Sequence, residues 1–132
     1  MVAGVSVADG LLHYEIRPKS FNGDAFAAFL ERLALKARRP LTVLLDNCRI
    51  HSTRAVKDVV RRCDIKLIFN VPYHPELNGI ELVWAIAKKR FKDLQLQRLL
   101  GTLDASFVEC IHRVLGQLTI EEVAKCCSNG LR

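Results

Sequence analysis

Leu-Thr-Val-Leu-Leu-Asp-Asn, residues 41–47, is the pattern of a buried β-strand that ends in a carboxylate, Asp46. A second carboxylate, Glu81, follows in the sequence Asn-Gly-Ile-Glu of residues 78–81, which is typical of the first turn of a helix. Asp46 and Glu81 have 34 residues between them, about the length of one strand-helix-strand unit. In an α/β fold, carboxylates at such positions can converge and bind a divalent cation through hard oxygen ligands.

The flanking segments also alternate between strand and helix patterns. Residues 2–7 and 11–16 predict a β-hairpin around Asp9-Gly10, because Asp-Gly suits the left-handed residues of a hairpin turn. Asp9 is therefore interpreted as a turn residue rather than a catalytic one. Apolar residues at helical spacing predict a helix from Asn22 to about Arg39 and another from Ser52 or Thr53, and residues 65–69 predict a second buried strand.

The C-terminal part, residues 100–132, has the pattern of supporting helices. Thr102 is a candidate cap for one helix, and Thr119 with Glu122 has the spacing of a capping box at the start of the next. No internal repeat or long linker divides the chain. We therefore expect residues 1–132 to form one domain.

Composition favours a domain that stays inside the cell and binds a polyanion. The 132 residues are 50% hydrophobic and 26% charged, with a formal net charge of +6. The apolar runs are far shorter than a membrane span, and the N-terminal residues lack the pattern of a secretory signal. The five cysteines show no Cys-x-x-Cys spacing, so we expect reduced thiols rather than a zinc site.

Basic residues continue from Glu81 along the predicted helix. Lys88, Lys89 and Lys92 recur on the side of the helix that carries Glu81. A carboxylate beside a basic ridge suits a metal ion and a phosphate backbone. Arg54 belongs to the outward face of the preceding helix, and its charge alone leaves open whether that face meets solvent or phosphate.

Three strings together resemble the catalytic core of mariner-like transposases, which are DDE superfamily endonucleases. They are Asp-Asn-Cys-Arg-Ile-His (46–51), Pro-Tyr-His-Pro-Glu-Leu-Asn-Gly-Ile-Glu-Leu-Val-Trp (72–84) and Lys-Lys-Arg (88–90). The spacing from Asp46 to Glu81 matches the second and third acidic residues of that family. The resemblance runs from the first hairpin to about Phe91.

The resemblance implies a ribonuclease H-like mixed sheet flanked by helices, and DNA cleavage and joining with two Mg²⁺ or Mn²⁺ ions. Asp46 and Glu81 would be catalytic residues and metal ligands. The resemblance also implies a nuclear protein that binds DNA without sequence preference and in a salt-sensitive manner. The candidate DNA-contacting residues are Lys88, Lys89, Arg90, Lys92 and Arg54.

Two departures from the family pattern affect these expectations. The family's first catalytic Asp lies on a central strand upstream of the hairpin that opens this chain, so we expect a truncated or domesticated core with an incomplete metal site. Without that strand, two inner sheet edges would stay unpaired, which predicts a rearranged sheet, a homodimer or a marginally stable fold. The second departure is Gly79, where the family commonly has Pro, and we expect Gly79 to loosen the approach to Glu81.

The residues leave open whether this chain cleaves DNA. A different reading is a non-catalytic protein-interaction or dimerisation module built on the same fold. His51 and His74 lie within the motif, and each is as consistent with a hydrogen bond to local backbone as with contact to metal or DNA.

Overall fold

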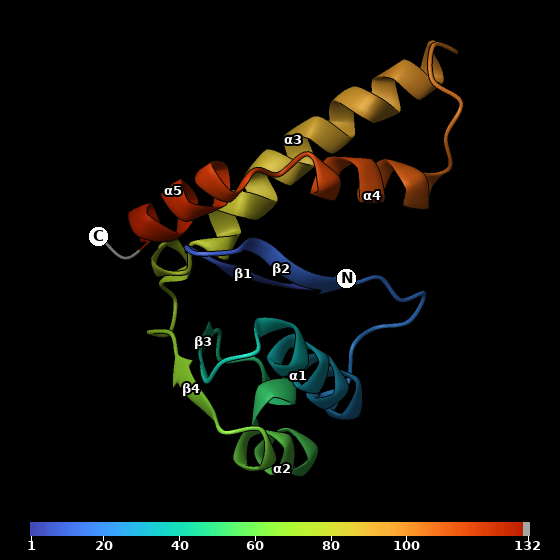
Figure 1. The fold of residues 1–132 in the computed structure, drawn as a ribbon. Helices are drawn as coiled ribbons and strands as arrows, with labels where there is room; N and C mark the ends of the chain where they lie inside the picture. The colour runs from blue at the N-terminus through green and yellow to red at the C-terminus, as the bar shows by residue number, and fades with distance from the viewer. Residues whose placement is uncertain (131–132) are drawn as a thin grey trace.

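A computed structural model describes residues 1–130 as an α/β fold (Figure 1). Short 3₁₀ turns occupy Arg49–Ser52 and Pro75–Leu77. The strands and helices in chain order are β1 (Val2–Ser6), β2 (Gly10–Glu15), α1 (Gly23–Ala37), β3 (Leu41–Leu45), α2 (Arg54–Arg62), β4 (Ile65–Phe69), α3 (Ile80–Leu99), α4 (Phe107–Gly116) and α5 (Ile120–Gly130).

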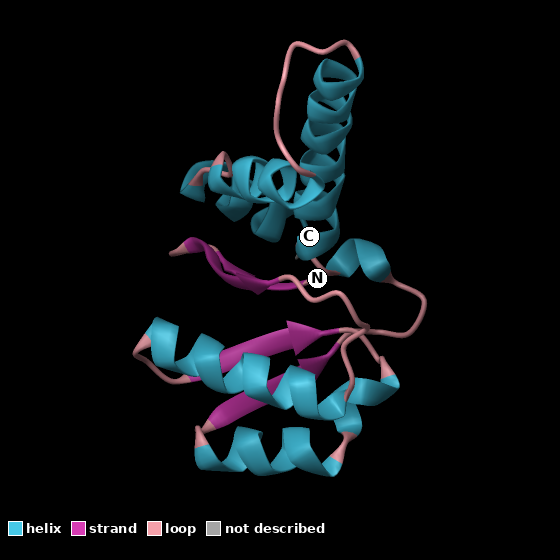
Figure 2. Cartoon of the chain, turned by 90° about the vertical axis from the view of Figure 1, so that its right-hand side faces the viewer, coloured by secondary structure: helices cyan, strands magenta, loops and turns pink. Residues whose placement is uncertain are grey.

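The strands form two separate two-stranded sheets. β1 and β2 form the expected antiparallel hairpin, and β3 pairs with β4 in parallel, with Leu41 opposite Ile65 and Leu45 opposite Phe69. Figure 2 shows the hairpin and the β3–β4 pair as two separate groups of strands, with the hairpin nearer the C-terminal helices. The inner edges of β1 and β3 are therefore unpaired, as expected for a ribonuclease H-like sheet without its central strand.

The first hydrophobic cluster lies where α1 and α2 pack together beside β3 and β4. The apolar stripe of α1, predicted from its helical spacing, is buried there, and α1 begins at the predicted cap, where Asn22 Oδ1 accepts from Ala25 N at 2.9 Å. The buried members of this cluster are Phe26, Ala27, Phe29, Leu30, Leu33, Val56, Val59 and Ile65.

A second, smaller cluster joins α3 to α5. Val83 of α3 and Val123 and Cys126 of α5 are buried together. An ion pair between Arg90 and Glu122 crosses the same two helices. α4 and α5 both contact α3, so the C-terminal helices hold the helix that carries Glu81 (Figure 1).

Two local expectations were wrong. β3 and β4 are not buried on both faces, because the hairpin does not continue their sheet: Thr42, Ile68 and Phe69 are exposed. The helix expected from Thr102 starts instead at Phe107, where Ser106 and Glu109 form a reciprocal capping box that Thr102 lacks.

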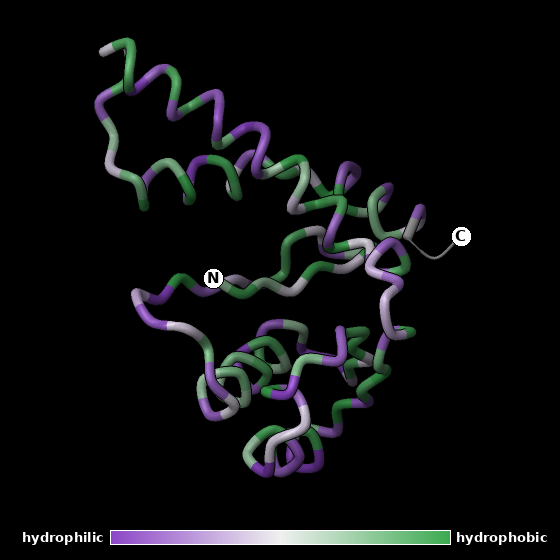
Figure 3. The backbone as a smooth tube through the Cα atoms, turned by 180° about the vertical axis from the view of Figure 1, so that it is seen from behind, coloured by the Kyte–Doolittle hydropathy of each residue, from purple (hydrophilic) through white to green (hydrophobic). Residues whose placement is uncertain are grey.

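Hydrophilic and hydrophobic residues alternate along α3 (Figure 3), and its buried residues are Val83 and Ala87, near its start. No helix within residues 1–130 combines the length and the apolar character that a bilayer crossing requires.

Candidate active site

Asp46 comes directly after β3, at the carboxyl end of the β3–β4 sheet, where open α/β sheets hold their ligands. Its Oδ1 accepts a hydrogen bond from the backbone N–H of Cys48 at 3.0 Å, which turns the chain back on itself. The side chain remains 67% exposed, so most of the carboxylate faces outward.

His51 packs beside Asp46 and fixes the loop that follows it. Its Nδ1 lies 3.1 Å from the backbone oxygen of Asp46 and 3.0 Å from Asp46 Oδ1. The imidazole is only 12% exposed and its centroid lies 4.3 Å from that of the Phe26 ring. A ring held on both sides in this way orients the neighbouring carboxylate, so His51 has a positioning role in this arrangement.

A buried asparagine connects the end of β3 to the segment that leads into α3. The Asn70 N–H donates to Leu45 O at 2.8 Å, and Asn47 Nδ2 donates to Asn70 O at 2.7 Å. The Asn70 side chain in turn donates to His74 O at 2.7 Å and accepts from Val71 N at 2.9 Å. Because all of these groups are paired, the path from Asp46 to the start of α3 is fixed by hydrogen bonds as well as by prolines.

Glu81 is the second residue of α3 and is exposed. The N-cap position of α3 is Gly79 rather than Asn78, and Asn78 Oδ1 accepts from Ile80 N at 3.3 Å from the residue before the cap. Gly79 has ordinary helical angles, so its conformational freedom is not used. A Cβ at position 79 would lie 2.5 Å from Cys127 Cα, so the residue lets α5 approach the start of α3. The expectation that Gly79 loosens this region is replaced by a packing role.

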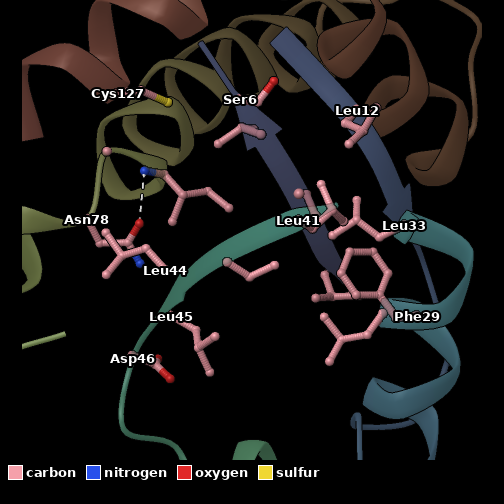
Figure 4. Close-up of a pocket in the computed structure, with 18 of the residues that line it drawn as sticks. Ser6, Leu12, Phe29, Leu33, Leu41, Leu44, Leu45, Asp46, Asn78 and Cys127 are labelled. Atoms are coloured by element: carbon pink, nitrogen blue, oxygen red, sulfur yellow. Dashed lines mark hydrogen bonds between the residues drawn. The ribbon is translucent and has the colours of Figure 1, made fainter. Parts of the chain in front are cut away.

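One cavity of about 470 Å³ brings the two carboxylates together. Asp46, His51 and Glu81 line it, along with residues of β1, β3 and α1 (Figure 4). Most of its wall is apolar, as the labelled leucines and Phe29 in Figure 4 illustrate. Asp46 and Glu81 therefore contribute negative charge to a mostly apolar opening that Arg39 and His51 also line.

The predicted basic residues lie outside this cavity. Lys88, Lys89 and Lys92 are exposed on α3, and within residues 1–130 none of them forms an ion pair. Arg54, at the start of α2, is 96% exposed and lies 4.0 Å from Asp58. Arg90 is already engaged by Glu122 and by the Gln117 backbone oxygen, so its guanidinium supports the α3–α5 contact.

Neighbouring titratable groups have structural rather than reactive environments. Burial raises the pKa of the Cys126 and Cys127 thiols, which favours the protonated form of both. A hydrogen bond from His74 lowers the pKa of Glu76 within the connector. Asp9, the turn residue, pairs with Arg39, and this hydrogen bond lowers its pKa.

The described residues fall short of a complete metal site. Asp46 and Glu81 supply hard oxygen donors to one cavity, which suits Mg²⁺ or Mn²⁺ in kind. However, residues 1–130 contain no group of three or more His, Cys, Asp or Glu side chains arranged to hold a metal ion. Two of the expected oxygen donors, Asp46 and Glu81, are therefore present at the cavity. The described residues do not supply a complete set of metal ligands.

Sequence reasoning missed the roles of Asn47 and Asn70 and left that of His51 open. A polar residue directly after each of two parallel strands was the available signal, since parallel strands end at the same sheet edge. The Asn70 side chain donates to the backbone oxygen of His74, and no sequence pattern predicts that contact.

Comparisons with known proteins agree with this geometry. The sequence pattern of the DDE superfamily endonuclease family matches residues 1–104. None of the curated proteins compared with the chain matches it. Among solved structures, the chain resembles the catalytic domain of Mos1 transposase with raltegravir and Mg, at 20% identity and a TM-score of 0.52, covering 94% of this chain and 71% of that one.

Two further Mos1 structures give the same result. The catalytic domain of Mos1 mariner transposase matches at 18% identity and a TM-score of 0.51, covering 94% of this chain and 70% of that one. The catalytic domain solved with raltegravir and Mn matches at 20% identity and a TM-score of 0.52, covering 94% of this chain and 72% of that one. At these identities the likeness establishes the ribonuclease H-like fold, and the family match covers most of the sequence: the chain belongs to the DDE superfamily endonucleases.

Proposed function

We propose that this chain is a nucleic-acid-binding core of a DDE transposase, with Asp46 and Glu81 as its second and third acidic residues. The observation that carries the proposal is that both carboxylates line one cavity, although they come from the end of β3 and the start of α3. Because the chain belongs to the DDE superfamily endonucleases, we interpret these two carboxylates as catalytic residues.

The DNA contact in this proposal is made by exposed cations beside the carboxylates. Lys88, Lys89 and Lys92 extend from Glu81 along α3, and Arg54 adds a further exposed charge on α2. Such cations contact the phosphates of DNA rather than the edges of its bases. DNA binding is therefore independent of sequence and weakens as the salt concentration rises. Arg90 contributes less, because Glu122 neutralises it.

Mg²⁺ or Mn²⁺ is the proposed cation, in line with the ions named for the Mos1 structures. Asp46 and Glu81 are its proposed ligands, and the remaining donors would come from outside the described residues. An activity of the chain in the nucleus, as a transposase core or a domesticated relative of one, is part of the same proposal. Within it, residues 100–132 serve to hold α3 in position.

Nicking of supercoiled plasmid DNA in the presence of Mn²⁺ tests the role of the carboxylates. The purified chain is compared with Asp46→Asn and Glu81→Gln, and with Asp93→Asn as a control for an exposed carboxylate on α3 outside the cavity. Nicking lost in the first two variants alone supports both catalytic assignments. Nicking that survives both substitutions contradicts them. DNA binding without nicking by a folded chain restricts the function to binding.

A second candidate is a non-catalytic interaction or homodimerisation module. The open edges of β1 and β3 favour it, because exposed strand edges pair readily with other chains. Light scattering together with DNA titration separates the two proposals. A stable dimer without affinity for DNA supports the module, and a monomer that binds DNA supports the transposase core.

A further inference from the structure

Tyr73 combines a fully exposed side chain with a backbone conformation that tyrosine rarely adopts. The residue is 100% exposed, and its φ angle is +63°. Within residues 1–130, two other non-glycine residues have a positive φ, Arg38 and Asp64. Arg38 is the C-cap of α1, and Asp64 directly follows the C-cap of α2. Left-handed residues commonly end helices, so those two have an ordinary explanation that Tyr73 lacks.

Tyr73 is the third residue of a tight turn. The His74 N–H donates to Val71 O at 3.2 Å, with Pro72 and Tyr73 between them. A turn with Pro at its second position and a positive φ at its third ordinarily has Gly or Asn there, because a larger side chain is strained. Tyrosine is therefore an unfavourable residue for this turn, and its exposed ring gains no packing that would offset the strain.

The turn is held in a fixed place beside the candidate active site. The buried Asn70 side chain bonds the backbone on both sides of Tyr73, at 2.7 and 2.9 Å. The Asn70 backbone oxygen accepts from Asn47, the residue directly after Asp46, at 2.7 Å. The connector that carries Tyr73 therefore begins beside Asp46 and leads into α3, which carries Glu81 (Figure 1).

A flat aromatic ring with both faces open suits a nucleobase. Stacking between a base and an aromatic side chain is strong and tolerates any base, because every base has a π-face. Bases inside a paired duplex are covered by their neighbours, so an unpaired base is the one that can stack on a side chain. In the proposed function, DNA phosphates lie at Asp46 and Glu81, which places bases near the same connector.

We propose that Tyr73 is a stacking platform for an unpaired DNA base next to the phosphate bound at Asp46 and Glu81. The chain accordingly prefers DNA with an unpaired end to a fully paired duplex. The inference rests on the proposed function and specifies its DNA substrate. A protein partner is less favoured, because aromatic anchors at protein interfaces typically lie within a well-packed patch, whereas residues 71–76 are all exposed in a narrow turn.

Binding of DNA that carries 2-aminopurine tests the proposal, since stacking on an aromatic ring quenches the fluorescence of this base. One short duplex ends in a single unpaired 2-aminopurine, and the control duplex has the same sequence with that base paired. The parent chain is compared in Mg²⁺ with Tyr73→Phe, which keeps a ring, and with Tyr73→Gly, which removes the ring and suits the positive φ. Anisotropy of an end label gives the affinities, and circular dichroism gives the thermal midpoints.

We expect the parent chain and Tyr73→Phe to bind the unpaired probe at least about fivefold more tightly than the paired one, with quenching. Tyr73→Gly should lose the preference and the quenching, keep its affinity for the paired duplex and melt no lower than the parent chain. Preference or quenching retained in Tyr73→Gly would overturn the proposal. A lower midpoint for Tyr73→Gly would also overturn it, by showing that the ring supports the fold.

The same titrations separate this inference from the proposed function. Affinity for both duplexes without a preference would overturn the stacking role and leave DNA binding intact. No affinity for either duplex by a folded chain would overturn both. A dimer of the parent chain that Tyr73→Gly dissociates, measured by light scattering, would overturn the stacking role by identifying the ring as a protein contact.

Discussion

At the scale of single residues, Gly79 shows why a glycine can be required without any special backbone angle. Gly79→Ala places a methyl group 2.5 Å from Cys127 Cα, within the contact between α3 and α5. Overpacking of this kind typically costs about 1–3 kcal/mol, because backbone on both sides has to move. We expect a lower thermal midpoint, measured by circular dichroism.

Gly116→Ala is the matched control for Gly79→Ala. A Cβ at Gly116, the last residue of α4, meets no atom within 4 Å. Alanine there is expected to leave the midpoint unchanged or raise it, since it lowers the entropy of the unfolded chain. Equal loss of stability in both variants would contradict the packing role assigned to Gly79.

Asn70 is the residue that ties the end of β3 to the approach of α3. Asn70→Ala removes its two side-chain bonds, to His74 O and from Val71 N, in a partly buried network. The expected cost is about 1–3 kcal/mol of unfolding free energy, measured by urea titration. Asn129→Ala, an exposed residue of α5, is the control. A loss at Asn70 no larger than that at Asn129 would show that the network is not stabilising.

Glu15 makes the hairpin's attachment to α1 sensitive to pH. Arg32 donates two hydrogen bonds to its carboxylate, at 2.5 and 2.8 Å, and lowers the pKa of Glu15. Because the pKa in the folded state is lowered, the stabilisation is present above the ordinary value of 4.5 and is lost as pH falls through the folded value. We expect Glu15→Gln to melt about 2–4 °C below the parent chain at neutral pH.

The gap between the two melting temperatures should close as the pH falls through the lowered pKa of Glu15, since the parent carboxylate is then protonated. Asp93→Asn, which removes an exposed carboxylate that forms no ion pair within residues 1–130, controls for net charge. A gap for Glu15→Gln that stays constant across the titration would contradict the role given to the Arg32 pair.

At the scale of elements, α3 carries the proposed DNA contacts. Lys88, Lys89 and Lys92 are exposed on this helix. Changing all three to Gln should reduce the slope of log affinity against log salt by about 2–3, because each phosphate contact contributes about 0.9. The measurement is fluorescence anisotropy of a labelled duplex at several salt concentrations.

A charge-matched control distinguishes this surface from net charge. Lys19, Lys36 and Lys66 are also exposed, and they lie before α1, at its end and on β4. Their change to Gln gives the same net charge and is expected to leave most of the slope intact. Equal effects of the two triple variants would contradict a binding surface on α3.

Sequence patterns predicted the elements well where local rules operate. The cap at Asn22, the hairpin around Gly10 and the carboxylate in the first turn of α3 all follow from short-range spacing. The start of α4 was wrong because Thr102 and Ser106 are both acceptable caps, and only Ser106 has a Glu three residues later. The contact of Gly79 with Cys127 was beyond prediction, since it depends on how α5 folds back onto α3.

At the scale of the whole molecule, the divided sheet is the dominant feature. The hairpin contributes to the cluster around α1 and α2, since Val2 and Leu12 pack against it, and the hairpin also contacts α5 on its other side. The unpaired edges were expected from the family resemblance, whereas the apolar cavity between them required the structure. Asp46 and Glu81 line this same cavity. The unpaired strand edges and the incomplete set of metal ligands therefore occur in the same part of the molecule.

Affinity for duplex DNA as a function of salt tests the central claim, that this fold is a nucleic-acid-binding core, most directly. The unmodified chain is titrated into a labelled duplex of arbitrary sequence between about 50 and 200 mM NaCl. We expect log affinity to fall linearly with log salt with a slope of about −3 to −4, from Lys88, Lys89, Lys92 and Arg54, and equally for unrelated sequences. Affinity that does not change with salt, or no binding at the lowest salt by a folded chain, would contradict it.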